Sequence, residues 1–277
     1  MKKEIKHNYN GCSNFYKYEF NSIHEFYDFI TKTPTNKAFK GYSLCSKRHE
    51  YGYKWYGTED WTECIDLLHN GWEDGSKKIT QRLKDLSKMD CDNFTRKTIY
   101  DIVGFQPSVP RYLQGVPTNM INQKLVPQKQ KVVTISKSIA FTSGYSEEQI
   151  VDFSAKCLRI VKKIEQQGVR CNLNILNVDR CGSDGLMVKV RVKNANERLN
   201  IGKLAFLMAH PSVKRRLIFR FVETFEECSR KWTSVYGYSV MSQNELKRFA
   251  EKNEIILPSV VDFDEDSIKD LNSLVGK

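Results

Sequence analysis

The sequence lacks most of the short motifs that identify a particular chemistry. Its eight cysteines contain no Cys-x-x-Cys pair and its five histidines no His-Glu-x-x-His pattern, so neither a zinc knuckle nor a zinc hydrolase is indicated. The nucleophile pattern Gly-x-Ser-x-Gly and the phosphate-binding pattern Gly-x-x-x-x-Gly-Lys-Ser/Thr are also absent. We therefore expect no metal and no cofactor. A non-enzymatic protein is favoured, and a hydrolase or nuclease without a recognisable motif stays open as an alternative.

Long apolar runs are missing as well. No stretch approaches the roughly 18 apolar residues that a membrane span needs, so we expect no contact with a membrane. Met1–Asn10 is basic and has no apolar centre of the kind found in secretory signals, which predicts a cytoplasmic protein. Cysteines stay reduced in that compartment, and Cys64, Cys157 and Cys171 fall in predicted helices and a strand, where we expect buried thiols.

The clearest pattern present is an alternating unit from Val132 to Val222. Apolar residues that alternate or cluster in short runs predict strands, and apolar residues at helical spacing predict helices. Six elements result, in the order β-α-β-β-α-β: Val132–Phe141, Ser146–Gln167, Val169–Val178, Met187–Val192, Asn200–His210 and Leu217–Val222. This order places both helices on one face of a sheet, so the fold class is α+β, an α/β sandwich. The other face is expected to be exposed and basic, or covered by the N-terminal part.

The unit divides the 277 residues into three regions. Residues 1–123 are expected to form a helical, aromatic-rich N-terminal elaboration, residues 131–225 the core, and residues 226–277 an extension with an acidic tail. The last region offers one candidate edge strand, Glu254–Val261.

Within the N-terminal region, residues 1–14 are polar and expected to be frayed. Four elements are then expected: a strand at Tyr16–Phe20, a helix capped by Ser22, a helix over Thr58–Asn70 capped by Thr58, and a helix over Asp74–Ser87. Four prolines punctuate residues 88–131. Proline density of this kind disfavours helices and central strands, which predicts an extended crossing segment whose apolar residues pack on the rest of the protein.

The net charge of +11 is unevenly distributed. Residues 186–220 hold nine lysines and arginines against one glutamate, whereas residues 250–277 hold seven acids against three lysines. Such a basic region suits a polyanion or an acidic protein surface, and solubility alone explains it equally well. The candidate binding residues are the outward-facing cations of one strand, the cluster after His210, and two residues of the proline-rich segment: Lys189, Arg191, Lys193, Lys214, Arg215, Arg216, Arg111 and Tyr112.

Two further groups of residues are candidate sites. Asp262, Asp264 and Asp266 alternate, but the glycine and the distal glutamate of a calcium loop are missing, so we expect no metal there. A nucleophilic cysteine paired with His210 is the one enzymatic arrangement left open, and nothing in the sequence places the two together.

Three stretches resemble a family of uncharacterised proteins encoded by bacteriophages, prophages and plasmids: Trp55–Thr58 with Cys64–Gly75, Val109–Pro117 with Met120, and Leu204–Glu223. The resemblance covers roughly residues 15–225 and implies no activity. The C-terminal half also resembles the α/β fold of von Willebrand A-type domains, which implies an open α/β sheet as an alternative architecture. The aspartate of the metal motif of such domains is missing near Ile135–Ser138.

Together these features predict a phage-encoded, non-enzymatic binding protein in the cytoplasm of its bacterial host, or associated with the virion. It is expected to act by protein–protein contact, as an accessory or host- or defence-directed factor. The alternative is a nucleic-acid-binding protein that contacts phosphates through residues 189–216.

Overall fold

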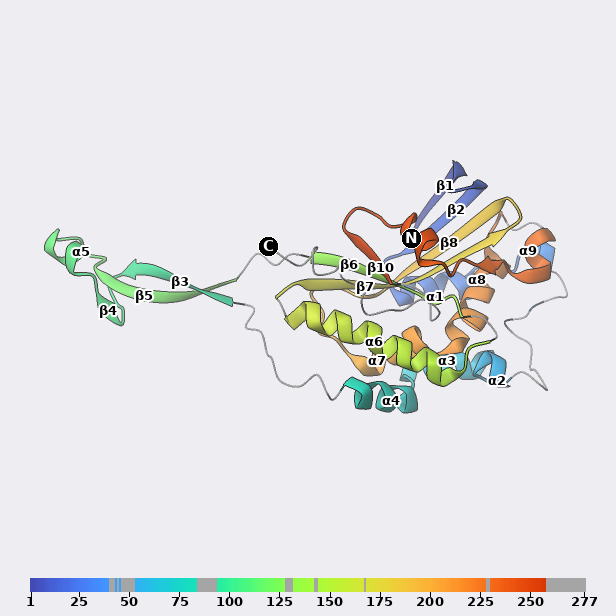
Figure 1. Ribbon diagram of the computed structural model, residues 1–277, viewed down its shortest axis with the longest axis horizontal. Helices are drawn as coiled ribbons and strands as arrows, with labels where there is room; N and C mark the ends of the chain where they lie inside the picture. The colour runs from blue at the N-terminus through green and yellow to red at the C-terminus, as the bar shows by residue number, and fades with distance from the viewer. Residues whose placement is uncertain are drawn as a thin grey trace.

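A computed structural model describes residues 1–39, 43, 45, 53–83, 94–127, 132–141, 144–166, 168–227 and 230–257. Its centre is a seven-stranded mixed sheet with the order β1-β2-β8-β7-β6-β10 (Figure 1). The seventh strand, β9, pairs with the C-terminal end of β7 at Asp179 and Arg180. The strands are β1 (Lys2–Tyr9), β2 (Cys12–Phe20), β6 (Val132–Ser138), β7 (Arg170–Cys181), β8 (Asp184–Lys193), β9 (Tyr238–Ser239) and β10 (Glu254–Leu257).

The direction of the strands changes across the sheet. β6 runs parallel to both of its neighbours, β7 and β10, whereas β7 and β8 form an antiparallel pair. On the other side of β8, β2 is parallel to it and β1 returns antiparallel to β2. The fold is therefore α+β, as the sequence predicts, and its sheet draws strands from all three predicted regions of the chain.

Helices cover one face of this sheet in two layers. The inner layer consists of α1 (Ile23–Lys32), α6 (Glu147–Gln166), α7 (Ile201–Ala209), the π-helical η2 (Val213–Ile218) and α8 (Phe219–Thr224). In the outer layer, α4 (Glu73–Leu83) packs on α6 and α7, and α3 (Trp61–Asn70) packs on α7 and η2. Short elements complete this part: η1 (Lys37–Phe39), α2 (Tyr53–Tyr56) and α9 (Arg230–Val235). Of the N-terminal helices, α1 packs on the sheet while α3 and α4 pack on other helices, and the opposite sheet face is not covered by them.

Residues Leu217–Val222 were expected to be the last strand of the core unit, and this prediction is wrong. They lie in η2 and α8, and Val213, Leu217, Phe221 and Val222 are all fully buried. A short apolar run fits a buried helix as well as a buried strand, because periodicity disappears when every side is covered. The strand position beside β6 is taken instead by β10, which begins at the expected residue, Glu254.

The expectation that residues 1–14 are frayed is also wrong. β1 and β2 form a hairpin in register from Lys2↔Glu19 to Tyr9↔Cys12, with Asn10 and Gly11 in its turn. Both turn residues have positive φ, at +50° and +80°, the conformation that Asn-Gly turns adopt readily. The polar composition of β1 reflects its place at the edge of the sheet, where lysines discourage pairing with another chain.

Helix caps mostly follow the sequence. The Ser22 hydroxyl accepts from the Glu25 amide at the start of α1, and Gly71 ends α3 with φ +86°. The start of α3 differs from the prediction, because Asp60 and not Thr58 caps it, accepting from the Glu63 amide at 2.9 Å. Thr58 is fully buried, and its hydroxyl accepts a hydrogen bond from Arg216.

Residues 88–131 contain regular structure where an extended segment was expected. β3 (Phe94–Asp101) and β5 (Met120–Pro127) form an antiparallel hairpin, which we call the arm. Its tip adds the short β4 (Gln106–Pro107), paired with β5, and the one-turn helix α5 (Val109–Leu113). The prolines disrupt neither β4 nor α5. Pro107 lies in a two-residue edge strand and Pro110 in the first turn of the helix, where proline is tolerated. Figure 1 shows the arm extending away from the main sheet.

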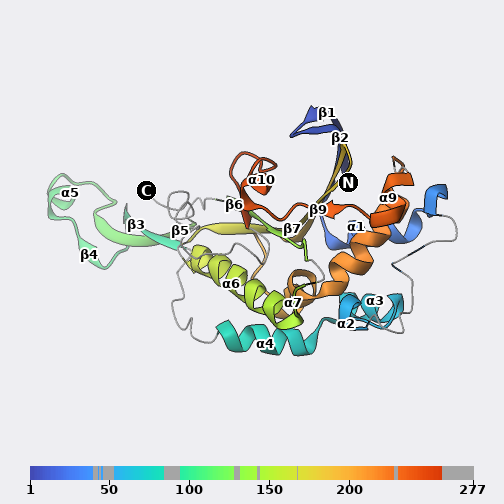
Figure 2. The same ribbon diagram turned by 45° about the vertical axis from the view of Figure 1, so that its right-hand side comes forward.

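The sheet face opposite the helices carries a smaller apolar core. Phe15, Val178, Met187, Val240 and Phe249 belong to this cluster. The segment around α10 (Gln243–Lys247) covers it, on the side of the sheet away from α6 and α7 (Figure 2). The open face is therefore closed in part by the C-terminal extension.

Candidate functional site

Most of the predicted basic residues lie inside the protein. Lys214 in η2 donates to both carboxylate oxygens of Asp179, at 2.7 and 3.0 Å, and to Asn177 at 2.6 Å. Lys214 and Asp179 are both almost inaccessible to solvent. Burial lowers the pKa of Lys214, and the neighbouring Asp179 opposes this shift. The ammonium group therefore belongs to an internal ion pair and offers no contact to a phosphate.

The two arginines that follow are engaged by the N-terminal region. Arg216 donates to the Thr58 hydroxyl at 2.7 Å and to the Thr58 carbonyl at 2.8 Å, and its guanidinium lies 4.5 Å from the centre of the Tyr56 ring. Arg215 donates to the Trp55 carbonyl and stacks over the Trp55 ring. Both side chains are buried, and burial lowers the pKa of Arg215 to about 10. The segment Trp55–Thr58 is thus the internal partner of the basic cluster.

Lys193 was expected on the same sheet face as Lys189 and Arg191, and the structure corrects this. The β7–β8 register shifts between Leu173 and Asn174, which pair with Lys193 and Arg191 respectively. The extra β8 residue forms a β-bulge, and an inserted residue reverses the facing of the side chains beyond it. Lys193 therefore points to the helical face, where it donates to Glu165 of α6 at 2.7 Å.

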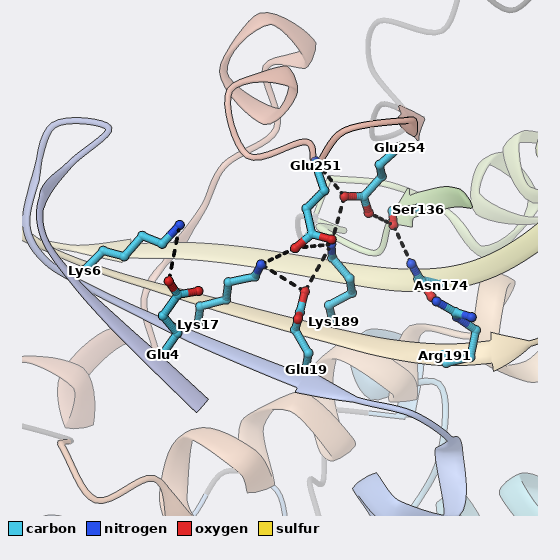
Figure 3. Close-up of polar contacts among 10 residues, drawn as sticks. All are labelled: Glu4, Lys6, Lys17, Glu19, Ser136, Asn174, Lys189, Arg191, Glu251 and Glu254. Carbon is cyan, nitrogen blue, oxygen red and sulfur yellow. Dashed lines mark hydrogen bonds and ion pairs between the residues drawn. The ribbon is translucent and has the colours of Figure 1, made fainter. Parts of the chain in front are cut away.

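Lys189 and Arg191 do share the opposite sheet face, and there they join acids from other strands (Figure 3). Lys189 contacts Glu254 at 2.8 Å and Glu19 at 3.3 Å. Lys17 pairs with Glu19 at 3.1 Å and with Glu251. We call this set the charge network: Lys17, Glu19, Ser136, Asn174, Lys189, Arg191, Glu251 and Glu254. Its three cations face three glutamates, so the predicted basic face is locally neutral.

Hydrogen bonds extend the network across β6 and β7 to Arg191. The Ser136 hydroxyl donates to Glu254, and Asn174 donates from Nδ2 to Ser136 at 2.9 Å. Asn174 in turn accepts from Arg191 Nε at 2.5 Å. Hydrogen bonding to Lys17 holds the pKa of Glu251 below its usual value, while burial lowers the pKa of Arg191. Among the described residues no further acceptor binds the terminal nitrogens of Arg191, and no ion pair involves it.

Arg191 lies between two cavities. The smaller, of about 210 Å³, is lined by the charge network, and the larger, of about 800 Å³, lies beside the ends of β2 and β8. Asn21, Arg191 and Asn194 border both cavities. Within the part of the chain that the structure describes, no cluster of three metal-binding side chains occurs. The residues that border both cavities carry side-chain hydrogen-bond donors.

The arrangement needed for a cysteine nucleophile is not found among the described residues. His210 is buried against the rings of Trp72 and Phe206, and its Nδ1 accepts from the Ser212 amide at 3.2 Å. Burial, followed by the nearby Arg215, lowers the pKa of His210 to about 3, so the ring is neutral. The described cysteines are all free and buried, and burial raises the pKa of each: Cys12, Cys45, Cys64, Cys157, Cys171 and Cys181. Thiols of this kind are unreactive. Asp262, Asp264 and Asp266 lie outside the described residues.

Arg111 and Tyr112 are carried on α5 at the tip of the arm, away from the other predicted binding residues. Arg111 donates to the Thr118 carbonyl at 3.0 Å and stacks on Tyr100, with 4.3 Å between the guanidinium carbon and the ring centre. Tyr112 is exposed to 67%. The apolar residues of this tip were expected to pack on the rest of the chain, but Val109 and Leu113 are exposed to 61% and 78%.

Comparison with known proteins defines a family without defining a function. A family model described as a domain of unknown function, DUF7192, matches residues 3–276. The chain belongs to this family. No curated protein and no solved structure matches the sequence or the fold. None of the helices within the described ranges is long and apolar enough to cross a membrane.

Sequence reasoning missed the acidic half of the charge network in this DUF7192 protein. Lys17 and Glu19 alternate with Tyr16, Tyr18 and Phe20, which is the pattern of a half-buried strand with charged residues on one face. That signal was available. The pairing of β2 with β8 brings Glu19 beside Lys189. It could not be predicted, because the parallel pairing of two distant strands produces no pattern in the sequence of either strand.

Proposed function

We propose that this protein is a non-enzymatic binding protein that contacts a protein partner through the tip of its arm. The observation that carries the proposal is a set of six large apolar side chains, each exposed to between 61% and 78% on an ordered tip. These residues, which we call the apolar tip, are Ile102, Val103, Phe105, Val109, Tyr112 and Leu113.

The apolar tip is held in a defined shape by backbone hydrogen bonds. The Phe105 amide donates to the Ile121 carbonyl at 3.0 Å, and the Ser108 amide donates to the Asn119 carbonyl at 2.7 Å. Gly104 permits this approach, because a Cβ atom there would lie 2.2 Å from the Ile121 carbonyl oxygen. A tip ordered before binding loses little conformational entropy on association, which favours affinity.

The size of the apolar tip supports a macromolecular partner. Six side chains of this kind, at the exposures given above, present roughly 700 Å² of mostly apolar surface. Each partner of a standard interface contributes about 800 Å². The tip alone therefore approaches one side of a specific protein interface.

The charge of the tip favours a protein over a nucleic acid. Residues 98–123 carry a single acid, Asp101, and a single cation, Arg111, whose guanidinium is bound by Thr118 and Tyr100. Nucleic-acid affinity rests largely on lysines and arginines that reach phosphates. The alternative function is nucleic-acid binding through residues 189–216. The net charge of +11 supports it, but most of its predicted contact residues are bound to groups of the protein itself. A salt titration with duplex and single-stranded DNA tests it, and affinity that falls steeply with salt would revive it.

The proposal extends to origin and location. We infer a protein encoded by a phage, prophage or plasmid that acts in the cytoplasm of a bacterial host as an accessory or host-directed factor, and the free, buried thiols support a reducing compartment. The likeness to von Willebrand A-type domains has the support of a parallel centre formed by β7, β6 and β10. Adhesion through a bound metal has none, because the aspartate of the metal motif is missing near Ile135–Ser138, where Lys137 donates to the Met208 carbonyl at 2.6 Å.

Site-specific photo-cross-linking tests the proposed contact. A photoreactive phenylalanine is placed at Leu113, or at Tyr238 as the control, since Tyr238 lies on the main sheet with 69% exposure. After irradiation in a lysate of the bacterial host, we expect one cross-linked protein that depends on the Leu113 position. The captured protein is then produced separately and its Kd is measured with purified chain. A cross-linked dimer of the chain itself would identify a second copy as the partner.

The matched substitutions are Tyr112→Ser and Tyr238→Ser, which remove the same side chain at nearly equal exposure. Truncation of an interface hot spot costs about 2 kcal/mol or more, so Tyr112→Ser should weaken binding at least about 30-fold. Tyr238→Ser should leave the Kd unchanged. Equal affinities for the two variants, or equal cross-linking from both positions, would refute the proposal.

A further inference from the structure

The larger cavity exists because β2 stops before β8 does. Phe20 is the last residue of β2 and pairs with Val190, and the chain then turns at Asn21 into the Ser22 cap of α1. β8 continues to Lys193, so its final residues pass beyond the end of β2. The cleft of about 800 Å³ lies at this step, bordered also by the end of α3 and the start of α7.

Arg191 is the distinctive polar group of the cleft. Each of the other cations of the charge network, Lys17 and Lys189, contacts at least two carboxylates. Arg191 has only the neutral Asn174 oxygen as a partner among the described residues, and only through Nε. Its terminal nitrogens, which form the planar fork that recognises carboxylates and phosphates, are the part left over for a ligand.

The other residues that line the cleft indicate the chemistry of the rest of the ligand. Ile23, Leu68, Trp72 and Leu207 contribute apolar lining, and the polar residues Asn21 and Asn194 line the cleft together with Arg191. Ligand sites typically have volumes of about 300–1,000 Å³ and combine an apolar wall with a few converging polar groups. The cleft matches this description on both points.

The charges of the cleft also favour an anion. Lys203 adds a second cation at its border, and no ion pair to it occurs among the described residues. The two acids present are already engaged, because Glu73 pairs with Lys77 at 2.7 Å and Glu197 accepts from the Asn194 side chain and backbone. Glu254 and Glu19 act on Arg191 electrostatically from the side of the charge network, but within the described residues neither forms an ion pair with it. An incoming anion therefore displaces no carboxylate that is bound to Arg191.

We propose that this cleft binds a small organic anion, a carboxylate or phosphate ester with an aromatic or aliphatic body, and that Arg191 is its anion contact. Arg191 lies on the charge-network face of the sheet and the wall of Leu68 and Trp72 on the helical face, so the ligand passes the open edge of β8 beyond Phe20. Its anionic group lies at Arg191 and its body along that wall. The site is separate from the apolar tip of the arm, so the two proposals succeed or fail independently.

Binding of three naphthalene compounds to the full chain tests the proposal. 1-Naphthyl phosphate, 1-naphthoate and neutral 1-naphthol share one ring system and differ in the head group, so they separate a phosphate from a carboxylate requirement. Affinity is measured by calorimetry, and the site is located from amide shifts at Gly71 and Gly202 in an NMR spectrum. We expect at least one of the two anions to bind about tenfold or more tightly than 1-naphthol, since hydrogen bonds to charged groups are the stronger kind.

Two variants and one control assign the contact. Arg191→Gln should weaken binding of the preferred anion by about tenfold or more, and Arg191→Lys, which keeps the charge but loses the fork, should weaken it by less. Arg82→Gln removes the same charge from the outer helix α4 and should have no effect. Arg191→Lys, together with the thermal midpoints of all variants, keeps the test valid if Arg191→Gln fails to fold.

Several results would overturn the proposal. They are equal binding of 1-naphthol and both anions, unchanged binding in folded Arg191→Gln, and amide shifts confined to the arm. Failure of both anions to bind at millimolar concentration would overturn it as well. A Tyr112→Ser variant must retain anion binding, because the arm takes no part in this site.

Discussion

The buried pair of Lys214 and Asp179 allows a quantitative prediction for Lys214→Met. Methionine preserves the length and packing of the side chain in η2 but removes the ammonium group. Lys214 Nζ lies 2.7 and 3.0 Å from the two oxygens of Asp179, and Asp179 has no exposure to solvent. The substitution therefore leaves a carboxylate inside the protein that, among the described residues, has only the donors of Asn177 and Ser239, at 2.6 and 2.7 Å.

Removing one partner of a buried ion pair typically costs about 3–5 kcal/mol, because the other charge stays desolvated. Domains are stable by about 5–15 kcal/mol in total, so the variant should fold but lose a large share of its stability. Asp179→Asn added to Lys214→Met replaces the uncompensated charge by a neutral amide. Its oxygen can accept from the Asn177 side chain, and its NH2 group can donate to the Ser239 hydroxyl. The double variant should therefore be more stable than Lys214→Met alone.

Urea denaturation of the wild type, both single variants and the double variant gives the coupling free energy of the pair. Lys77→Met is the control, because Lys77 and Glu73 form an exposed pair on α4. The control should leave the midpoint unchanged. If Lys214→Met costs less than about 1 kcal/mol, the pair behaves as a surface salt bridge and the reasoning from burial is wrong.

Three further predictions concern other sites. The pKa of His210 is about 3 in the folded protein and ordinarily 6.5, so the unfolded chain takes up a proton that the folded protein does not. Stability should be full above pH 6.5 and fall by about 1.4 kcal/mol per pH unit as the pH drops towards 3, and His210→Gln should flatten this slope in urea titrations at pH 7 and 5. Asp60→Ala removes the cap of α3 and should cost about 1 kcal/mol, whereas an equal loss from Glu59→Ala would contradict the assignment. Gly104→Ala places a Cβ atom against the Ile121 carbonyl and should disturb amide signals of the arm while the main sheet keeps its spectrum.

Local signals in the sequence predicted α6, β7 and β8. α6 shows helical spacing and charged residues at its first turn, and β7 and β8 show alternation around a short turn at Gly182. Helices begin at Ser22 and Asn200 and one ends at Gly71, as expected. These features depend on residues within one or two turns of each other, so the chain carries them without reference to its neighbours in space.

The structure of the arm could not be predicted from the sequence. Its prolines argued against regular structure, yet they lie in a short edge strand and in the first turn of α5, the positions where a missing amide costs nothing. Composition alone cannot distinguish these positions from disruptive ones. The exposure of Val109, Tyr112 and Leu113 was equally invisible, since apolar residues predict burial unless the place of the segment is known.

The sequence by itself determined the fold class, the central helix–strand pattern and the presence of excess positive charge. The tertiary structure alone decided where that charge lies: Lys214 in an ion pair under the sheet, Lys193 turned to the helical face by a bulge, and Arg191 at the border of a cleft. The physical reason is that burial and charge pairing are made by strands and helices distant in the chain. A lysine or arginine looks the same in the sequence whether its partner is water, a buried carboxylate or a ligand.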